Sequence, residues 1–255
     1  MIVGNLTKHK VLELVKSGKR IDGRKHIERR DISIEIGVID KAEGSARVKL
    51  GNTDLIVGVK LGVGTPYPDS KDQGNLRTTV ELTCLSNPEY ELGPPSIEAI
   101  ELARVTDRVV RESKAIDLKK LCIISGEKVW TVFIDIYTID ADGNLFDAAA
   151  MGAVAALKSA RLTKLDSENN PIYGEFEGKF PIAKFPKQTT IVKIGDSLLL
   201  DPTEIEEKCA TSRITIGTCE GAMVSLQLGG AGLTPEDVMK ALDIAFEKEN
   251  EISYD

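Results

Sequence analysis

The sequence predicts a mixed fold of strands and helices in two related halves. Runs of alternating polar and apolar residues, rich in β-branched side chains, recur along the chain and predict strands. Each half ends in a helical segment, one over about 146–161 and the other over 235–247. With 255 residues, the chain can bury roughly 75% of its unfolded surface, enough for one large domain or two closely packed ones.

In the first half, a helix is expected from Thr7 to Ser17, with Gly18 ending it. A second helix is expected to begin after the capping residue Ser96 and to run to about Ser113. The expected strands lie at 32–39, 44–50, 53–61, 76–85, 121–125 and 130–139, and polar loops at 62–74 and 87–95. The Ala-rich helix after the last strand is apolar on most sides, so we expect it to be buried.

The second half repeats this pattern. The polar stretch 166–178 is the best candidate for a boundary, which divides the chain into residues 1–165 and 166–255. Strands are expected at 190–194, 197–200, 213–218 and 221–228. Thr234 is the expected N-cap of the last helix, with Pro235 at its first position.

Composition excludes several classes of protein. The 33 basic and 40 acidic residues give a net charge of −7, which argues against a free-standing, non-specific nucleic-acid binder. Any polyanion site must be a local patch, which a partner can complete. The four cysteines show no C-x-x-C spacing, so we expect no zinc site and interpret them as reduced core cysteines of a cytosolic protein. No signal-length or membrane-length apolar run is seen, so no membrane association is expected.

The segment from Asp140 to Asp147 has the layout of a strand-to-helix anion site. The N-terminus of the following helix would present free N–H groups and a positive dipole end to a phosphate. Such a site also needs a hydroxyl and an arginine, but Asn144, Leu145 and Phe146 stand in these places. Asp147 is expected to repel an anion. The alternative is an ordinary turn in which Asp147 favours the first helical turn.

Three arginines of the helix after Ser96 share one face, because Arg104, Arg108 and Arg111 are spaced i, i+4, i+7. One interpretation is a solvated face compensated by Glu101 and Asp107. The other is a row of clamps for the phosphates of an RNA backbone.

Two acids six residues apart, Asp201 and Glu207, follow the strand at 197–200. They could hold Mg²⁺ or act on a leaving group. The alternative is structural, since Thr203 and Glu206 fit a capping box.

Four motifs occur in the order found in the RNase PH family of phosphorolytic 3′-to-5′ exoribonucleases, which the chain resembles. They are Arg20-Ile21-Asp22-Gly23-Arg24, the segment 44–53, Gly93-Pro94-Pro95 and Asp140-Ala141-Asp142-Gly143, and together they span nearly the whole chain. Within the family, the chain most resembles the non-catalytic RNase PH-like subunit of the archaeal exosome ring.

The resemblance implies an α+β, RNase PH-like fold of two βαββα-type halves packed together. It implies no catalytic residues and no metal of the chain's own, because Asn144, Leu145 and Phe146 depart from the Ser or Thr and Arg that bind phosphate in catalytic members. Asp201 matches the family's catalytic acid, and Glu207 stands where a second Asp is usual. These five residues are interpreted as an active-site remnant.

The resemblance further implies that the three arginines hold RNA phosphates beside the active site of a catalytic RNase PH-like partner. Three heterodimers would form a hexameric ring in the cytoplasm, with RNA-binding cap subunits, single-stranded RNA as substrate, and inorganic phosphate and Mg²⁺ used by the complex. Two alternatives remain open: a self-sufficient phosphorolytic or metal-dependent exoribonuclease, and an oligomeric scaffold that binds no RNA.

Overall fold

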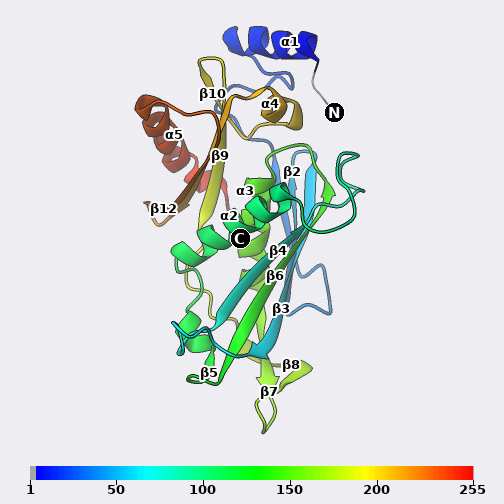
Figure 1. Ribbon diagram of the computed structural model, residues 1–255, viewed down its shortest axis with the longest axis vertical. Coiled ribbons are helices and arrows are strands. Elements are labelled where there is room, and N and C mark those ends of the chain that lie inside the picture. The colour runs from blue at the N-terminus through cyan, green and yellow to red at the C-terminus, as the bar shows by residue number, and fades with distance from the viewer. Residues whose placement is uncertain (1–3, 255) are drawn as a thin grey trace.

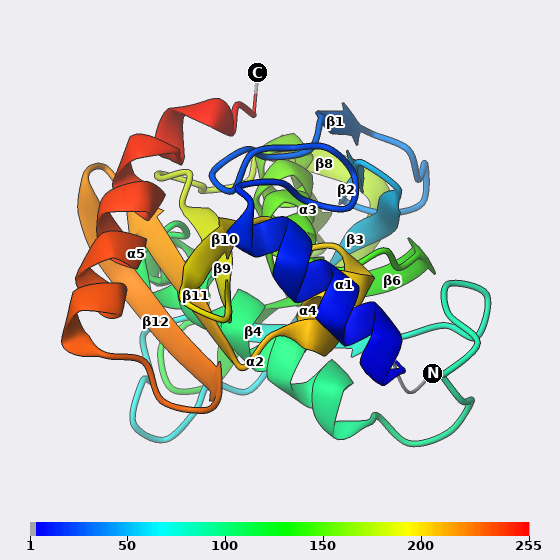
Figure 2. The same ribbon diagram turned by 90° about the horizontal axis from the view of Figure 1, so that it is seen from above.

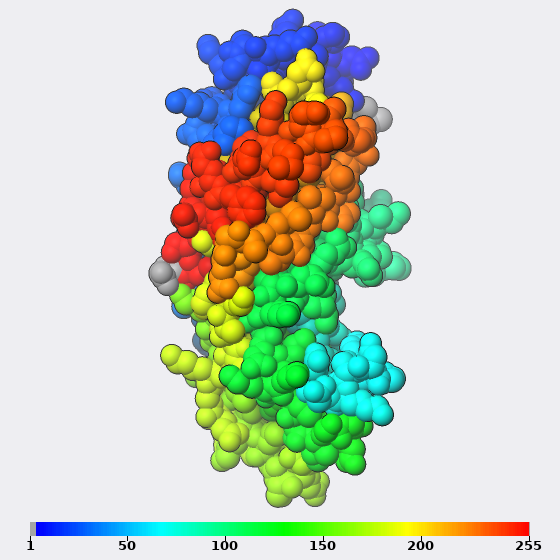
Figure 3. All heavy atoms as spheres, turned by 90° about the vertical axis from the view of Figure 1, so that its left-hand side faces the viewer, coloured from blue at the N-terminus to red at the C-terminus, as the bar shows by residue number. Residues whose placement is uncertain are grey.

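Two sheets with their covering helices lie end to end in an elongated molecule (Figures 1 and 3). The computed structural model describes residues 4–254. The C-terminal sheet and α1 (Asn5–Lys16) form one end, and the longer N-terminal sheet reaches to the other. A two-stranded hairpin, β7 (Arg161–Leu165) and β8 (Pro171–Lys179), lies at that far end.

The N-terminal sheet has the strand order β1-β2-β3-β6-β4, with β5 pairing with β6. Its strands are β1 (Ile32–Ile36), β2 (Gly44–Leu50), β3 (Thr53–Gly64), β4 (Asn75–Glu81), β5 (Cys122–Ile124) and β6 (Lys128–Asp140). Strand β4 pairs in parallel with β6, and the other pairs are antiparallel. Because β4 pairs only with β6, it lies at an edge of the sheet.

The C-terminal sheet is antiparallel, with the order β10-β9-β11-β12. Its strands are β9 (Lys187–Ile194), β10 (Ser197–Leu200), β11 (Ser212–Cys219) and β12 (Ala222–Gly230). Helix α4 (Glu204–Cys209) joins β10 to β11, and α5 (Pro235–Glu247) packs on β11 and β9 and is followed by the 3₁₀ turn η2 (Glu249–Glu251). Helix α1 also belongs to this end, because Val11 and Val15 pack against the apolar side chains of β9 and β10 (Figure 2).

Helix α3 (Leu145–Ser159) lies between the two sheets, packing against β2 and β3 on one side and β9 on the other. Twelve of its residues are buried, which explains why its sequence is apolar on most sides. Helix α2 (Ile97–Glu112) packs along β4 and α3 and buries Leu102, Val105, Val109 and Val110. The start of α3 therefore faces the junction of the two halves.

The predicted α+β fold is confirmed. The order β4, α2, β5, β6, α3 repeats as β10, α4, β11, β12, α5, so each half contains a βαββα unit. The differences from the predicted bounds are local. Residues 62–64, expected in a loop, continue β3, and β4 ends at Glu81 rather than at residue 85. Residues 118–121 form the 3₁₀ turn η1 (Leu118–Leu121), so the strand expected from residue 121 begins one residue later. Most of the stretch 166–178, expected to separate the halves, lies in the β7–β8 hairpin. The boundary at 165/166 stays a prediction.

The interpretation of all four cysteines as core residues was wrong for Cys84. All four are free thiols and Cys219 is buried, but Cys84 is exposed because β4 ends before it and the chain turns at the surface. Within residues 4–254, no helix is both long enough and apolar enough to cross a membrane.

Candidate functional site

The turn between β6 and α3 is held against the start of α4. Gly143 has a φ of +76°, and a Cβ there would lie 2.5 Å from the backbone of Thr203 and Glu204. Asn144 adopts a left-handed conformation with a φ of +51°, and its side chain accepts a hydrogen bond from the N–H of Asp147. Only glycine fits this close approach without strain, so the Asp-Gly pair of the motif has a structural reason.

Asp201 lies at the centre of a buried hydrogen-bond network. One carboxylate oxygen accepts from the backbone N–H of Arg30 at 2.8 Å, from its Nε at 2.9 Å and from Arg24 at 3.0 Å. The other accepts from Arg30 Nη2 at 2.8 Å and from Asn144 Nδ2 at 2.6 Å. Burial raises the pKa of Asp201, but the hydrogen bond and charge of Arg30 outweigh it and lower the pKa to about 2. The carboxylate is ionised and fully used inside the protein.

Asp147 is also directed into the protein, which corrects the expectation that it repels an anion in front of the turn. Its side chain is fully buried and accepts from Arg29 at 2.8 Å, from Asn144 at 2.9 Å and from the N–H of Thr190 at 3.1 Å. Burial raises the pKa of Asp147, and the charge of Arg29 opposes this rise. Asp147 thus ties the start of α3 to β9.

The turn of the first motif carries Arg20 and Arg24, and both side chains contact the C-terminal half at Asp201. Arg20 is buried and forms a fork with Glu206, the partner of Thr203 in the predicted capping box, which is present. It also donates to the carbonyls of Leu200 and Asp201 at 2.7 and 2.8 Å. These arginines therefore join the N-terminal segment to the C-terminal half.

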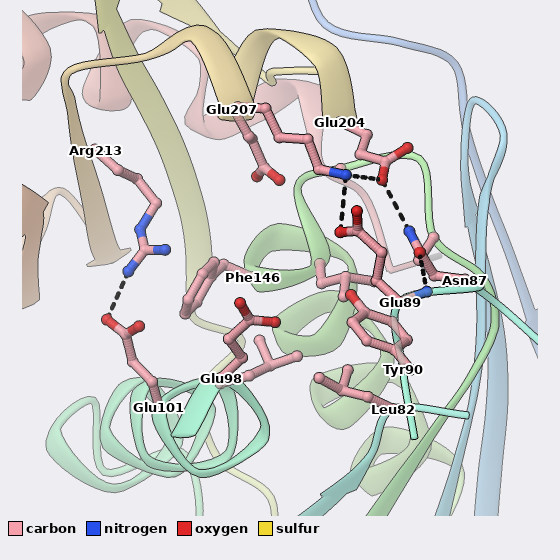
Figure 4. A pocket seen from close by; sticks show the side chains of 15 residues that line it. Leu82, Asn87, Glu89, Tyr90, Glu98, Glu101, Phe146, Glu204, Glu207 and Arg213 are labelled. Carbon is pink, nitrogen blue, oxygen red and sulfur yellow. Dashed lines mark hydrogen bonds and ion pairs between the residues drawn. The ribbon is translucent and has the colours of Figure 1, made fainter. Parts of the chain in front are cut away.

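A cavity of about 260 Å³ opens in front of α3. Figure 4 shows Glu207, Glu98 and Phe146 pointing into it. Five carboxylates line it against two cations: Glu89, Glu98, Glu101, Glu204 and Glu207, with Lys208 and Arg213. Both cations are already paired, Lys208 with Glu89 and Glu204 and Arg213 with Glu101. The electrostatics of the cavity are therefore unfavourable for an anion.

The carboxyl group of Glu207 accepts the N–H of Asn144 at 2.9 Å, directly before the first turn of α3. It lies beside the place where the layout of the turn predicts a bound anion. Burial raises the pKa of Glu207 to about 7, although the Asn144 N–H and the charges of Arg213 and Arg30 lower it. Since this environment disfavours even the chain's own carboxylate, a phosphate dianion meets a larger cost.

Leu145 and Phe146 line the same cavity. The ring of Phe146 lies 4.1 Å from the guanidinium carbon of Arg213, so the cation is held over an aromatic face. The structure thus brings Leu145, Phe146 and Glu207 to one cavity. Asn144 is buried behind this cavity and contacts Glu207 through its backbone N–H. Asp201 touches this group only through Asn144, because its oxygens point to the arginines behind the turn.

The pair Asp201 and Glu207 does not form a metal ligand set. Across the described chain, residues 4–254, no group of three or more His, Cys, Asp or Glu side chains is placed to hold a metal ion. Every strong acceptor position of Asp201 is engaged by an N–H donor, which leaves no lone pair for Mg²⁺.

A second cavity, of about 520 Å³, lies between β4 and α2. The structure brings the three predicted arginines of α2 to it and adds Arg77 from β4. Sequence reasoning missed Arg77, whose only signal was its place on the exposed phase of a predicted strand. We call this cavity the arginine groove, and it is lined by Leu76, Arg77, Thr78, Thr79, Ala103, Arg104, Asp107, Arg108, Arg111 and Glu112.

The arginines of α2 differ in their partners. Arg111 pairs with Asp107 at 2.9 Å and donates to the carbonyl of Leu76 at 3.2 Å. Arg108 donates to Gln227 at 3.0 Å. Arg104 is exposed and, among the described residues, has no hydrogen-bond or ion-pair partner. The local compensation expected of Asp107 is present, whereas that expected of Glu101 is not, because Glu101 pairs with Arg213.

Comparison with known proteins identifies the relatives of this chain. Residues 28–163 match domain 1 of the 3′ exoribonuclease family (RNase PH), and residues 185–248 match its domain 2. The chain is 48% identical over 251 residues to the exosome complex component Rrp42 of Methanothermobacter thermautotrophicus, covering 97% of this chain and 93% of that protein. It is 47% identical over 252 residues to Rrp42 of Methanocella arvoryzae, covering 98% and 95%.

Solved structures agree with these matches. A chain of the Archaeoglobus fulgidus exosome with RNA bound to the active site superposes with a TM-score of 0.88 at 40% identity, covering 97% of this chain and 96% of that one. A chain of an archaeal exosome core gives a TM-score of 0.84 at 38% identity, covering 97% and 94%. The RNase PH-like fold implied by the sequence motifs is confirmed.

Proposed function

This chain belongs to the 3′ exoribonuclease family, and we propose that it is a non-catalytic, RNA-binding structural subunit of an exosome ring. In this proposal it supports the active site of a catalytic RNase PH-like partner, which degrades RNA from 3′ to 5′ by phosphorolysis. The likeness to exosome components over nearly the whole chain supports its place in the complex. Two parts of the proposal rest on the two cavities: that the chain has no catalytic activity of its own, and that it contacts RNA.

The observation that carries the non-catalytic assignment is the contact of Glu207 with the N–H of Asn144 before α3. A phosphorolytic site must bind phosphate as the nucleophile, and this position holds a carboxyl group whose pKa is raised to about 7. Leu145 and Phe146 supply no donor side chain, and the nearby Arg213 is engaged by Glu101. The site therefore lacks the positive charge and the hydrogen-bond donors that would replace the hydration shell of a phosphate.

RNA binding is supported by the arginine groove. The chain has a net charge of −7, so four arginines gathered around one groove form a local exception. Guanidinium groups bind phosphates in a bidentate manner and read no base, which suits an enzyme complex that must handle every sequence.

We infer that the chain pairs with the catalytic partner and that three such heterodimers close a hexameric ring in the cytoplasm. Cap subunits that bind RNA, and single-stranded RNA as the substrate, complete the complex. Inorganic phosphate and Mg²⁺ act in the partner's active site, and this chain needs no cofactor of its own. A self-sufficient metal-dependent nuclease has less support, because the oxygens of Asp201 are engaged by arginines and Asn144.

The test is the release of nucleoside diphosphate from a 3′-tailed RNA in phosphate and Mg²⁺. It compares this chain alone, the catalytic partner alone and the assembled complex. We expect no release by this chain alone, and activity of the complex that falls when Arg104 and Arg108 are replaced by Gln. Lys240→Gln is the matched control, because Lys240 is an exposed cation on α5, away from both cavities. Phosphate-dependent release by this chain alone refutes the proposal.

A further inference from the structure

We propose that the cavity of about 260 Å³ in front of α3, here called the acidic cavity, is a docking site for an arginine side chain of the catalytic partner, whose guanidinium group pairs with Glu98 and Glu207. This inference rests on the proposed function and goes beyond it. The place that cannot hold a phosphate becomes a contact between the two subunits.

Two of the five carboxylates in the acidic cavity have no cation of their own. The other three are paired with Lys208 or Arg213. Within residues 4–254, Glu98 has no hydrogen-bond or ion-pair partner. One oxygen of Glu207 accepts the N–H of Asn144, and its other oxygen has no donor among the described residues. Both side chains point into the cavity (Figure 4), which therefore lacks a positive charge.

The electrostatic potential of the acidic cavity favours a cation. Burial, followed by the charges of Glu98 and Glu207, raises the pKa of Tyr90 to about 12. Burial also makes the ionised form of Glu207 unfavourable, and a bound cation would remove this penalty. A carboxyl group that is kept in a cavity against its own desolvation indicates a binding role.

The volume and the walls of the acidic cavity fit one long side chain. At about 260 Å³, the cavity is smaller than the roughly 300–1,000 Å³ of pockets that hold a whole drug-sized ligand. Leu82, Leu102, Tyr90 and Phe146 supply apolar walls for an alkyl stem. A guanidinium group at the end of that stem has five N–H donors in a planar fork, which is enough for two carboxylates.

Exposed apolar side chains beside the acidic cavity indicate that the occupant belongs to a protein. Ile97 and Ile100 on α2 are 85% and 48% exposed, and Leu92 in the preceding loop is 90% exposed. Ile97, Ile100 and Arg104 are spaced i, i+3 and i+7, so these isoleucines continue the arginine face of α2. Glu98 lines the cavity from the same first turn. A subunit that lies against the arginine groove therefore also covers this apolar surface and reaches the cavity.

The experiment measures the dissociation constant between this chain and the catalytic RNase PH-like subunit. The variants are Glu98→Gln and Glu207→Gln, with Glu236→Gln as the control, because Glu236 is an exposed acid on α5 that does not line the cavity. Each cavity variant is expected to weaken the complex at least about tenfold, since it removes one partner of an enclosed ion pair. Ile97→Ser is expected to weaken it as well, and Met239→Ser, a matched change of an exposed apolar residue on α5, is not.

The pH dependence of binding separates an ion pair at Glu207 from a change of fold. A cation favours the ionised carboxylate, and the ionised fraction of a group with a pKa of about 7 rises about tenfold from pH 6 to pH 8. The affinity of the wild type should rise by about this factor, and that of Glu207→Gln should rise less. The other charged or titratable groups around Glu207 are the same in both proteins: Glu98 and Glu101 on α2, Glu89 and Tyr90 in the loop before it, Glu204 and Lys208 on α4, Arg213 on β11, and Arg30 and Asp201 behind the turn.

Three results would overturn the inference. If both cavity variants bind the partner as tightly as Glu236→Gln does, the inference fails and the proposed function stands. If millimolar spermidine raises the thermal midpoint of the isolated wild type but not of Glu98→Gln, while both bind the partner equally, the cavity holds a free organic cation and the inference is wrong. If the wild-type chain does not bind the catalytic subunit at all, the proposed function fails together with the inference.

Discussion

Glu207→Gln is expected to stabilise the protein above neutral pH and to leave its stability nearly unchanged in acid. In the folded chain the carboxyl group meets desolvation, which raises its pKa from 4.5 to about 7. The folded state therefore binds more protons than the unfolded state between these two values. Stability must fall as pH rises through this window, because the proton that the fold retains is lost.

The magnitude follows from the shift. At about 1.4 kcal/mol per pKa unit, the change from 4.5 to about 7 corresponds to about 3.5 kcal/mol. This value is an upper limit, because Glu207 lines a cavity that water can reach. Gln keeps the shape and the oxygen that accepts the N–H of Asn144, so the variant removes the charge and retains the contact.

Urea unfolding of the full chain, with and without the substitution, from pH 4.5 to pH 8.5 measures the difference. The two free energies of unfolding are expected to agree near pH 4.5 and to separate by up to about 3.5 kcal/mol in favour of Gln at pH 8.5. Glu98→Gln, an exposed acid of the same cavity, serves as the control. A variant that is less stable than the wild type at pH 8.5 refutes the reasoning, since it means that α3 and Arg213 stabilise the anion more than burial costs.

Three further outcomes are expected. Asp201 has its pKa lowered from 3.8 to about 2, so it contributes about 2 kcal/mol that is complete above pH 4 and lost as pH falls toward 2. Acid titration of the folded fraction should show this loss in the wild type and not in Asp201→Asn. At pH 7, Asp201→Asn should cost about 3 to 5 kcal/mol in urea unfolding, because it leaves Arg30 buried without its counter-charge; a cost below 1 kcal/mol contradicts the network. Gly143→Ala should lower the thermal midpoint far more than Gly174→Ala: both glycines have positive φ, but only at Gly143 would a Cβ meet backbone atoms, at 2.5 Å. Equal effects of the two would mean that the turn can move away from α4.

Local sequence patterns were sufficient to predict most elements of the fold. The caps at Ser96, Thr203 and Thr234 lie where the sequence places them, because each capping interaction joins residues only three apart. Strand bounds came from the alternation of side chains, which holds in the half-buried sheets. The turn between β6 and α3 was also predictable, including the lack of donor side chains at Leu145 and Phe146.

The parts that failed depend on partners distant in the sequence. The sequence left open whether Asp201 has a chemical or a structural role, because its partner Arg30 lies 171 residues earlier. Asp147 points to Arg29, at a separation of 118 residues, and no pattern around either residue reports the contact. Arg77 and α2 come together only because β4 lies at the sheet edge, a consequence of topology rather than of local sequence.

The arginine cluster at residues 20–30 also affects the order in which the chain can fold during synthesis. Arg20 is made early, but its partner Glu206 follows 186 residues later, which at typical translation rates is a wait of about 10 to 40 seconds. During that time the N-terminal sheet can form while these cations remain in water. The junction can close only after α4 has left the ribosome, so docking of the N-terminal segment should follow the folding of the N-terminal sheet.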